Sequence, residues 1–200
     1  MVVKISEEQK AIITGTLLGD GYIHKDKYGG CRLEIKHSES QKEYVFWLHQ
    51  KLSTICPGLP KKRTDNNQWK FNTESNSDLI NFRRLFYPNG LKVVPKNISE
   101  FLTNPLSLAI WYMDDGSLDF RPKSHYAFSL KTNAFTLEEC RLLSKVLDNN
   151  FGIISSIQYP ICRSKRYPQI YIGKTGRDRF VKIIEPFILN CFRYKLPKYN

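Results

Sequence analysis

The sequence has no long hydrophobic run. Hydrophobic residues make up 41 % of its 200 residues, but the longest uninterrupted apolar stretches fall far short of the roughly 20 residues that span a bilayer. The first ten residues, MVVKISEEQK, lack the apolar core of a secretory signal and the Arg- and Ser-rich character of a transit peptide. We therefore expect an intracellular protein with no membrane partner. The sequence leaves open whether its compartment is a bacterial or archaeal cytoplasm or an organelle matrix.

Cysteine and histidine are few and scattered. The five cysteines are odd in number and never form a C-x-x-C pair, and the four histidines form no H-x-x-x-H or mixed Cys/His cluster. These absences argue against a disulfide framework, a structural zinc site and an H-E-x-x-H protease. We expect reduced thiols, and histidines that are structural or face solvent.

Acidic residues are also in deficit. Lysine and arginine number 31 against 19 aspartates and glutamates, which gives a formal net charge of +12, while 13 % of the residues are aromatic. A chain of this size and apolar content buries a real core in spite of the excess charge. A strongly basic folded protein with no membrane-spanning segment favours nucleic acid as its partner.

The chain repeats itself at an offset of 95 residues. Asp20 in LLGDGYI pairs with Asp115 in YMDDGSL, and the neighbouring glycines pair with each other. The match continues without a gap from residue 20 to residue 52, which chance explains poorly. The further pairs are Ile23 and Leu118, Leu33 and Phe128, Ile35 and Leu130, Lys36 and Lys131, Glu43 and Glu138, Leu48 and Leu143, and Leu52 and Leu147.

Each half predicts the same order of elements: a helix, a hairpin, a second helix, another hairpin and a final helix. The first helix of half one is expected to begin after Ser6, an N-cap residue with Gln9 three positions later, and to run to Gly19. Its counterpart is expected to begin near Asn104, which a proline follows, and to run to Asp114.

Alternating apolar and polar residues predict half-buried strands at 31–37 and 126–132. Later strands are expected at 67–73 and 168–174, and further helices at 41–53, 77–86, 136–149 and 177–189. Pro88, Gly90 and Pro95 mark a connection between the halves. We therefore predict an α+β fold with an N-terminal half at 1–90, a connector at 91–104 and a C-terminal half at 105–200.

The first helix of each half is apolar almost all round, so each is expected to pack on its own sheet and on its twin. Gly15 and Gly19 would let the two backbones approach closely. Asp20 and Asp115 then emerge together at helix C-termini, which already carry about half a unit of negative charge each. Carboxylates with free carbonyl oxygens suit Mg²⁺. This predicts a metal-dependent phosphodiesterase with one carboxylate for each strand of a duplex.

The alternative interpretation is that each Asp-Gly pair merely ends a helix and opens a turn. Recurrence of the acid in a matched context favours the functional interpretation. Asp114, by contrast, has no acidic counterpart in half one, where Gly19 stands at the equivalent position. Only the repeating acids are therefore expected to be indispensable.

The stretches ITGTLLGDG (13–21) and LAIWYMDDG (108–116) resemble the two signature motifs of the single-chain LAGLIDADG homing endonucleases. The similarity covers nearly the whole chain and extends to GLKVVPKN and RYKLPKY. It implies two pseudo-twofold-related αββαββα halves packed through the paired motif helices, with antiparallel sheets that form a DNA-binding saddle. Thr14, Thr16, Ile110 and Trp111 depart from the family's pattern, which predicts an asymmetric helix interface.

The resemblance also implies roles for the acids. Asp20 and Asp115 match the metal-binding position of the motif, and the residues before them, Gly19 and Asp114, would lend carbonyl oxygens. The Asp114 side chain is expected to lie behind the metal ligands and not among them. Mg²⁺ is the expected ion, with Mn²⁺ or Ca²⁺ able to substitute for binding.

Family members place a lysine near each metal centre, and Lys92 and Lys195 match those positions. The resemblance thus implies a monomeric, intron-encoded endonuclease that cuts both strands of a long asymmetric DNA target. Two alternatives stay open: a group I intron maturase whose partner is intron RNA, and a DNA-binding regulator that has lost catalysis. Retention of both acids and both lysines argues against the regulator and only weakly against the maturase.

Polar positions on the strands and basic residues in the loops would read the DNA, with arginine on guanine and amide side chains on adenine as the expected specific contacts. Together they predict strongly salt-dependent binding. The predicted contacts are Arg32, Glu34, Lys36, Ser129, Lys131 and Asn133 on the sheets, and Lys25, Lys61, Arg63, Gln68, Lys70, Arg121, Lys165, Arg166 and Gln169 in loop-rich basic stretches.

Overall fold

The computed structural model describes residues 4–121, 125–162 and 164–198. The first half contains α1 (Glu7–Leu18), β1 (Tyr22–Lys25), β2 (Cys31–Ser38), α2 (Lys42–Lys51), β3 (Lys61–Lys62), β4 (Gln68–Asn72) and α3 (Ser77–Phe86). After α4 (Ile98–Phe101), the second half contains α5 (Pro105–Asp115), β5 (Gly116–Arg121), β6 (His125–Lys131), α6 (Leu137–Phe151), β7 (Ser156–Gln158), β8 (Ile161–Cys162), β9 (Lys165–Arg166), β10 (Gln169–Ile172) and α7 (Arg177–Ile184).

Each half forms one antiparallel sheet of four strands, in the order β1-β2-β4-β3 and β5-β6-β10-β7. The two sheets share their register: Ile23 lies opposite Leu33 in the first, and Leu118 opposite Phe128 in the second. The second pair lies 95 residues after the first, which is the offset of the sequence repeat. The repeat therefore corresponds to a duplicated supersecondary unit. The expected α+β fold of two related αββαββα halves is confirmed.

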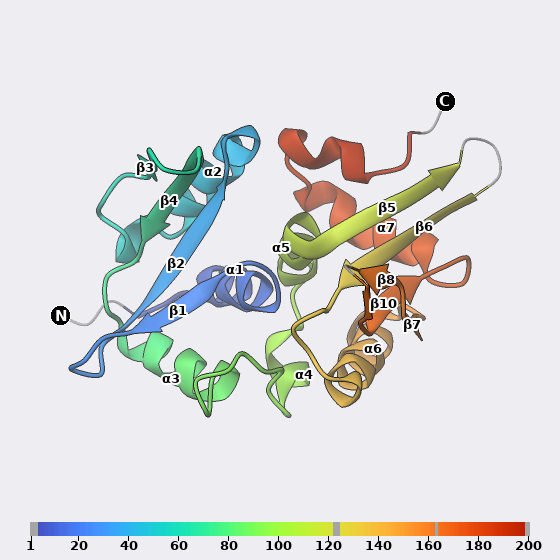
Figure 1. The fold of residues 1–200 in the computed structure, drawn as a ribbon, viewed down its shortest axis with the longest axis horizontal. Coiled ribbons are helices and arrows are strands. Elements are labelled where there is room, and N and C mark those ends of the chain that lie inside the picture. Colours follow the sequence, from blue (N-terminus) through green and yellow to red (C-terminus); the bar gives the residue numbers. More distant parts are fainter. Residues whose placement is uncertain (1–3, 122–124, 163, 199–200) are drawn as a thin grey trace.

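Helices cover one face of each sheet and leave the other open (Figure 1). α2 and α3 pack on the first sheet, and α6 and α7 on the second. Along β2, Cys31, Leu33 and Ile35 are buried while Arg32 and Lys36 are exposed. The alternation predicted from sequence is therefore real, since the apolar side faces the helices and the polar side faces outward.

α1 and α5 lie side by side between the two sheets (Figure 1). A Cβ on Gly15 would lie 2.5 Å from the carbonyl oxygen of Ser107 and 2.8 Å from Cβ of Ile110. The Ser107 hydroxyl donates to the Ala11 carbonyl at 2.8 Å, across the same interface. The close and asymmetric approach expected of these helices is confirmed, because glycine on one side accommodates a bulky side chain on the other.

Three features differ from the sequence expectation. The last helix, expected at 177–189, ends at Ile184 because Pro186 lacks an N–H and its ring clashes with the preceding turn. The connector contains α4, whose Ile98 is buried and which packs on α1 and α6. The second half carries an extra ribbon of β8 and β9. The boundaries at 90 and 104 stay a prediction. Among the described residues, no helix is both long and apolar enough to cross a bilayer.

Candidate active site

The two repeated aspartates stand at matching ends of the paired helices. α1 begins with the capping box of Ser6 and Gln9 and is capped at its other end by Gly19, directly before Asp20. α5 begins at an asparagine N-cap and has Asp115 as its last residue. Because the helices run side by side, both carboxylates reach one cavity of about 250 Å³. Its lining includes Asp20, Asp115, Lys92, Lys131 and Asn133.

Asp115 is shielded from solvent and lies near a second carboxylate. Burial, reinforced by the negative charge of Asp20, raises the pKa of Asp115 to about 7, although Lys92, Lys195 and Lys131 act in the opposite direction. The nearby lysines therefore do not offset the cost of a buried charge on Asp115. Two carboxylates at one cavity supply the oxygen ligands that a hard divalent cation prefers.

This shift predicts how stability of the metal-free protein depends on pH. With a folded pKa near 7 and an ordinary pKa when unfolded, Asp115 binds its proton more tightly in the folded state, so stability contributed by this group falls as the pH rises from about 4 to 7. Each pKa unit corresponds to about 1.4 kcal/mol, and screening at this partly open site reduces the expected total to about 1–2 kcal/mol.

Urea unfolding in EDTA, measured for wild type and Asp115→Asn from acid to neutral pH, checks this expectation. Subtracting the variant isolates Asp115 from His37, whose pKa is lowered by burial and whose contribution has the opposite slope. We expect the stability difference to shrink toward low pH and Mg²⁺ to oppose the loss near neutral pH. A difference that does not vary with pH would contradict the assignment.

The two predicted lysines bond to the ends of the motif helices. Lys92 Nζ donates to the carbonyls of Gly19 at 2.5 Å and Gly21 at 3.1 Å. Lys195 Nζ donates to the carbonyls of Met113 at 2.6 Å and Tyr112 at 3.3 Å. Burial lowers the pKa of both lysines, and nearby aspartates oppose the shift. Each lysine thus places positive charge where the helix end is negative.

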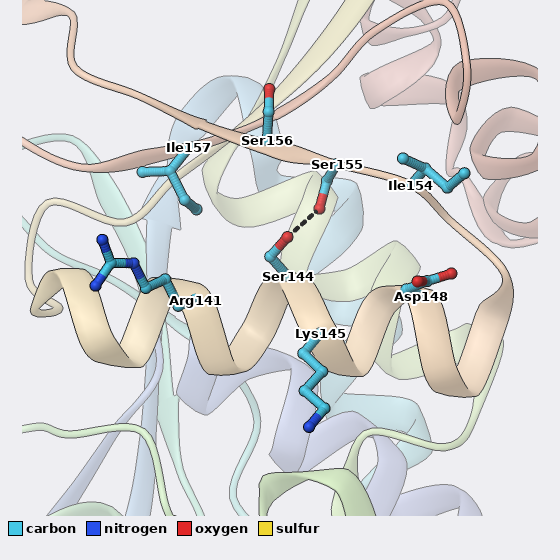
Figure 2. Close-up of a pocket in the computed structure, with 8 residues that line it drawn as sticks. All are labelled: Arg141, Ser144, Lys145, Asp148, Ile154, Ser155, Ser156 and Ile157. Carbon is cyan, nitrogen blue, oxygen red and sulfur yellow. Dashed lines mark hydrogen bonds between the residues drawn. The ribbon is translucent and has the colours of Figure 1, made fainter.

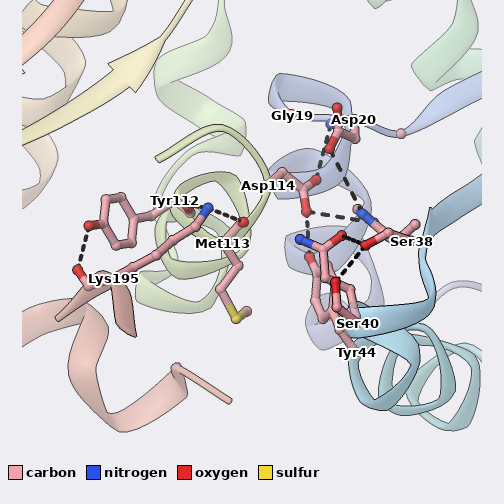
Figure 3. Close-up of polar contacts among 12 residues, drawn as sticks. Gly19, Asp20, Ser38, Ser40, Tyr44, Tyr112, Met113, Asp114 and Lys195 are labelled. Carbon is pink, nitrogen blue, oxygen red and sulfur yellow. Dashed lines mark hydrogen bonds and ion pairs between the residues drawn. The ribbon is translucent and has the colours of Figure 1, made fainter. Parts of the chain in front are cut away.

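Sequence reasoning missed a buried polar cluster beside Asp20 (Figure 3). Asp114 accepts from the Tyr44 hydroxyl at 2.8 Å and from the N–H of Asp20 at 3.1 Å. The ring nitrogens of His37 lie 3.9 Å from an Asp20 carboxylate oxygen and 3.8 Å from one of Asp114. Of the two expectations for His37, solvent-facing is wrong: the side chain is buried beside Asp20 and Asp114.

Within the described part of the chain, Asp20, His37 and Asp114 form the one group with metal-ligand spacing, their ligand atoms lying within 4.8 Å of one another. Burial and the charge of Asp20 raise the pKa of Asp114 well above its usual range. Both Asp114 oxygens already accept hydrogen bonds. This side chain therefore fits a place behind the ligands, while the roles of Asp20 and Asp115 as ligands stay predictions.

The predicted DNA contacts of half one lie on the open face of its sheet or at its rim. Lys25 is the last residue of β1, and Arg32, Glu34 and Lys36 share the outward side of β2. Lys70 on β4 lies opposite both Lys36 and Lys61. Three lysines in one cross-strand row repel one another, so a polyanion over this face would stabilise it. The rest of the set is Gln68 on β4 and Arg63, which pairs with Asp65 at the β3–β4 turn.

The predicted contacts of half two are arranged differently. Lys131 on β6 lies opposite Gln169 on β10, which in turn lies opposite Gln158. Ser129 is on the same strand as Lys131, whereas Asn133, expected on the sheet, lies in the turn after β6 and lines the acid-pair cavity. Most of the supposed loop residues are on strands, including Arg121 at the end of β5 and Lys165 and Arg166 on β9.

A second hollow, of about 380 Å³, lies between α6 and β7 (Figure 2). Arg141 and Lys145 contribute positive charge to it and Asp148 opposes them, while Ser144 and Ser155 hydrogen-bond at 2.7 Å. This hollow lacks the acid pair. Asp20, Asp115, Lys92 and Lys195 line cavities at the ends of α1 and α5 instead.

Paired apolar helices that end in carboxylates between two open, polar sheets define a two-motif nuclease architecture. The model of the LAGLIDADG DNA endonuclease family matches residues 10–180. The solved structure of the homing endonuclease I-WcaI bound to its DNA recognition sequence superposes with a TM-score of 0.85 at 24 % identity, covering 99 % of this chain and 89 % of that one. The saddle fold expected from the resemblance is confirmed.

Two curated relatives extend the match. The cytochrome b mRNA maturase bI2 of Debaryomyces hansenii is 32 % identical, over 98 % of this chain and 76 % of its own length. The DNA endonuclease I-ChuI of Chlamydomonas applanata is 29 % identical, over 99 % of this chain and 98 % of its own. The chain belongs to the LAGLIDADG DNA endonuclease family.

Proposed function

We propose that the protein is an intron-encoded, site-specific DNA endonuclease that hydrolyses both strands of a long asymmetric target with a divalent metal. The observation that carries this proposal is the shared cavity. Two repeated carboxylates and Lys92 line it between two polar sheet faces. Membership of the family and the full-length match to I-ChuI support the same activity.

Asp20 and Asp115 would hold the metal, and the carbonyls before them are the accompanying oxygen donors. Bound Mg²⁺ supplies stabilisation of developing phosphate charge and activation of the attacking water. Lys92 and Lys195 keep fixed positive charge beside the acids and hold the carbonyl ends of the helices. Such preorganised charge stabilises a transition state that gains negative charge.

The sheets would bind DNA and select its sequence. The row Lys61–Lys70–Lys36 in half one corresponds to the row Gln158–Gln169–Lys131 in half two. A lysine row contacts phosphates, while glutamine amides favour adenine edges. Such unequal surfaces within one chain fit an asymmetric target bound by a monomer.

Selection from a randomised duplex library tests the activity. Purified protein is incubated with the library in Mg²⁺, Mn²⁺ or Ca²⁺, and the cleaved ends are captured and sequenced. We expect one long asymmetric consensus in Mg²⁺ and Mn²⁺, and binding without cleavage in Ca²⁺. Absence of cleaved consensus in every metal, from protein that is folded, would overturn the proposal.

A second candidate is an intron RNA maturase, which the 32 % identity to the bI2 maturase favours. Intron RNA and the intronless DNA junction would be competed in a gel-shift assay. Preferential binding of the RNA would support the maturase, and preferential binding of the DNA the endonuclease. A catalytically inactive regulator fits less well because both acids and both lysines are in place.

Replacement of Lys92 by methionine tests the role of its charge. Methionine preserves most of the length and apolar contacts but removes the donor to the Gly19 and Gly21 carbonyls. We expect the single-turnover cleavage rate to fall roughly tenfold to a hundredfold, as for other preorganised charge donors, with DNA affinity nearly unchanged. Lys145→Met, an exposed lysine on α6, is the matched control. Equal rates for both variants would contradict a catalytic role for Lys92.

A further inference from the structure

The two motif helices support their aspartates in different ways. α5 runs through Asp115, so the N–H of this residue points back along the helix toward a carbonyl one turn earlier. α1 ends at Leu18, two residues before Asp20. The N–H of Asp20 instead donates to Oδ2 of Asp114, a side chain of the opposite helix. One acid is held by its own helix, and the other by its partner's.

Asp114 is itself held firmly from half one (Figure 3). Its side chain is 0 % exposed, and its second oxygen accepts from the hydroxyl of Tyr44, which is also fully buried. A Cβ on Gly19 would lie 2.5 Å from both Cβ and Oδ2 of Asp114. The glycine thus provides the space that the carboxylate occupies.

The second half has other contacts at the equivalent positions. Glu139, the repeat counterpart of Tyr44, accepts from the N–H groups of Thr136 and Val94 and so caps α6. Thr132, the counterpart of His37, donates to the carbonyl of Pro168. Asp114 itself has Gly19 as counterpart. The bridge from Tyr44 through Asp114 to the main chain is therefore particular to Asp20.

We propose that Asp114 is a positioning residue that holds the main chain of Asp20, and that Tyr44 orients its carboxylate. The inference rests on the proposed endonuclease activity. Without the Asp114 carboxylate, the N–H of Asp20 loses its hydrogen-bond acceptor. Asp115 keeps its place in the last turn of α5. A misplacement of about 1 Å costs roughly a hundredfold in rate at a preorganised site. The two strands of the target should then be affected unequally.

Strand-resolved cleavage tests the inference. Each strand of a plasmid-borne target is labelled, and single-turnover nicking is measured for Asp114→Ala, Asp114→Asn and Tyr44→Phe. Ser107→Ala is the control, because it removes a hydrogen bond from the far end of the same helix interface. We expect Asp114→Ala to slow one strand by roughly 30- to 100-fold and the other several times less, Tyr44→Phe to act in the same sense, and the control to affect neither.

The Asp114→Asn variant distinguishes a role in positioning Asp20 from a role of the Asp114 carboxylate as a metal ligand. Its oxygen can accept from the Asp20 N–H and its amide can donate to the Tyr44 oxygen, so Asp114→Asn should restore most of the rate. An asparagine variant as slow as alanine, or equal slowing of both strands by alanine, would overturn the inference.

Amide exchange provides a readout that does not need cleavage. In metal-free protein, NMR should show faster solvent exchange of the Asp20 amide in Asp114→Ala, but not in Asp114→Asn or Ser107→Ala. The Asp115 amide should not change. If the exchange rate of the Asp20 amide did not change in Asp114→Ala, the inference would be overturned. If wild type cuts no DNA while the amide result holds, the endonuclease proposal fails and the bridge stands.

Discussion

Replacing either Asp20 or Asp115 by asparagine will lower the rate of double-strand cleavage by roughly a thousandfold or more. Asparagine keeps the shape of the side chain but removes the negative charge that would hold the cation. A thousandfold loss corresponds to about 4 kcal/mol of transition-state stabilisation, which is within the several kcal/mol that a metal supplies to phosphoryl chemistry. Single-turnover cleavage of the selected target in Mg²⁺ measures the change.

DNA binding should survive these substitutions. Each removes a negative charge from a cavity that would face phosphates, so affinity measured without metal, in EDTA, should stay equal or rise. Asp148→Asn is the matched control, because Asp148 is an exposed aspartate on α6 away from the acid pair. Variants of Asp20 and Asp115 that both cut both strands as fast as this control would show that the active site lies elsewhere.

Features set by neighbours in the sequence could be predicted. The capping box of Ser6 and Gln9 forms as expected, because its bonds involve only a single turn of chain. The offset of 95 residues predicted the same order of elements in both halves, and the strand pairing of Ile23 with Leu33 repeats as Leu118 with Phe128. The repeat also brought Asp20 and Asp115 to matching helix ends, since duplicated units fold alike.

The polar cluster could not be predicted because its members are far apart in sequence. Tyr44 and Asp114 are 70 residues apart, and spacing rules for helices or metal motifs do not connect them. One signal was present: His37 occupies an inward position on β2, after Leu33 and Ile35. A polar residue at a buried register needs polar partners, which pointed to a buried site at that end of the strand.

The sequence repeat also indicates which residues meet at the helix interface. Positions related by the repeat meet across a pseudo-twofold axis, so Gly15 should lie near Ile110 and Gly19 near Asp114. The structure shows both proximities. A glycine in one half and a larger side chain at the same position in the other thus indicate complementary packing, not a lost function. This explains why Asp114 has no repeat and still has a structural partner.

Gly15 offers the sharpest test of that packing. Its Cβ would lie 2.5 Å from the backbone oxygen of Ser107 and 2.8 Å from Cβ of Ile110, so Gly15→Ala should destabilise the protein by about 1–3 kcal/mol and Gly15→Val by about 3 kcal/mol or more. The steric cost of the added Cβ must be larger than the gain in helix propensity of about 1 kcal/mol from glycine to alanine for Gly15→Ala to destabilise the protein. Urea unfolding measures it, with Gly58→Ala as control because a Cβ at Gly58 meets nothing within 4 Å. If Gly15→Ala were as stable as wild type, the helices would have to be further apart than this interface allows, and the acids at their ends would not share one cavity.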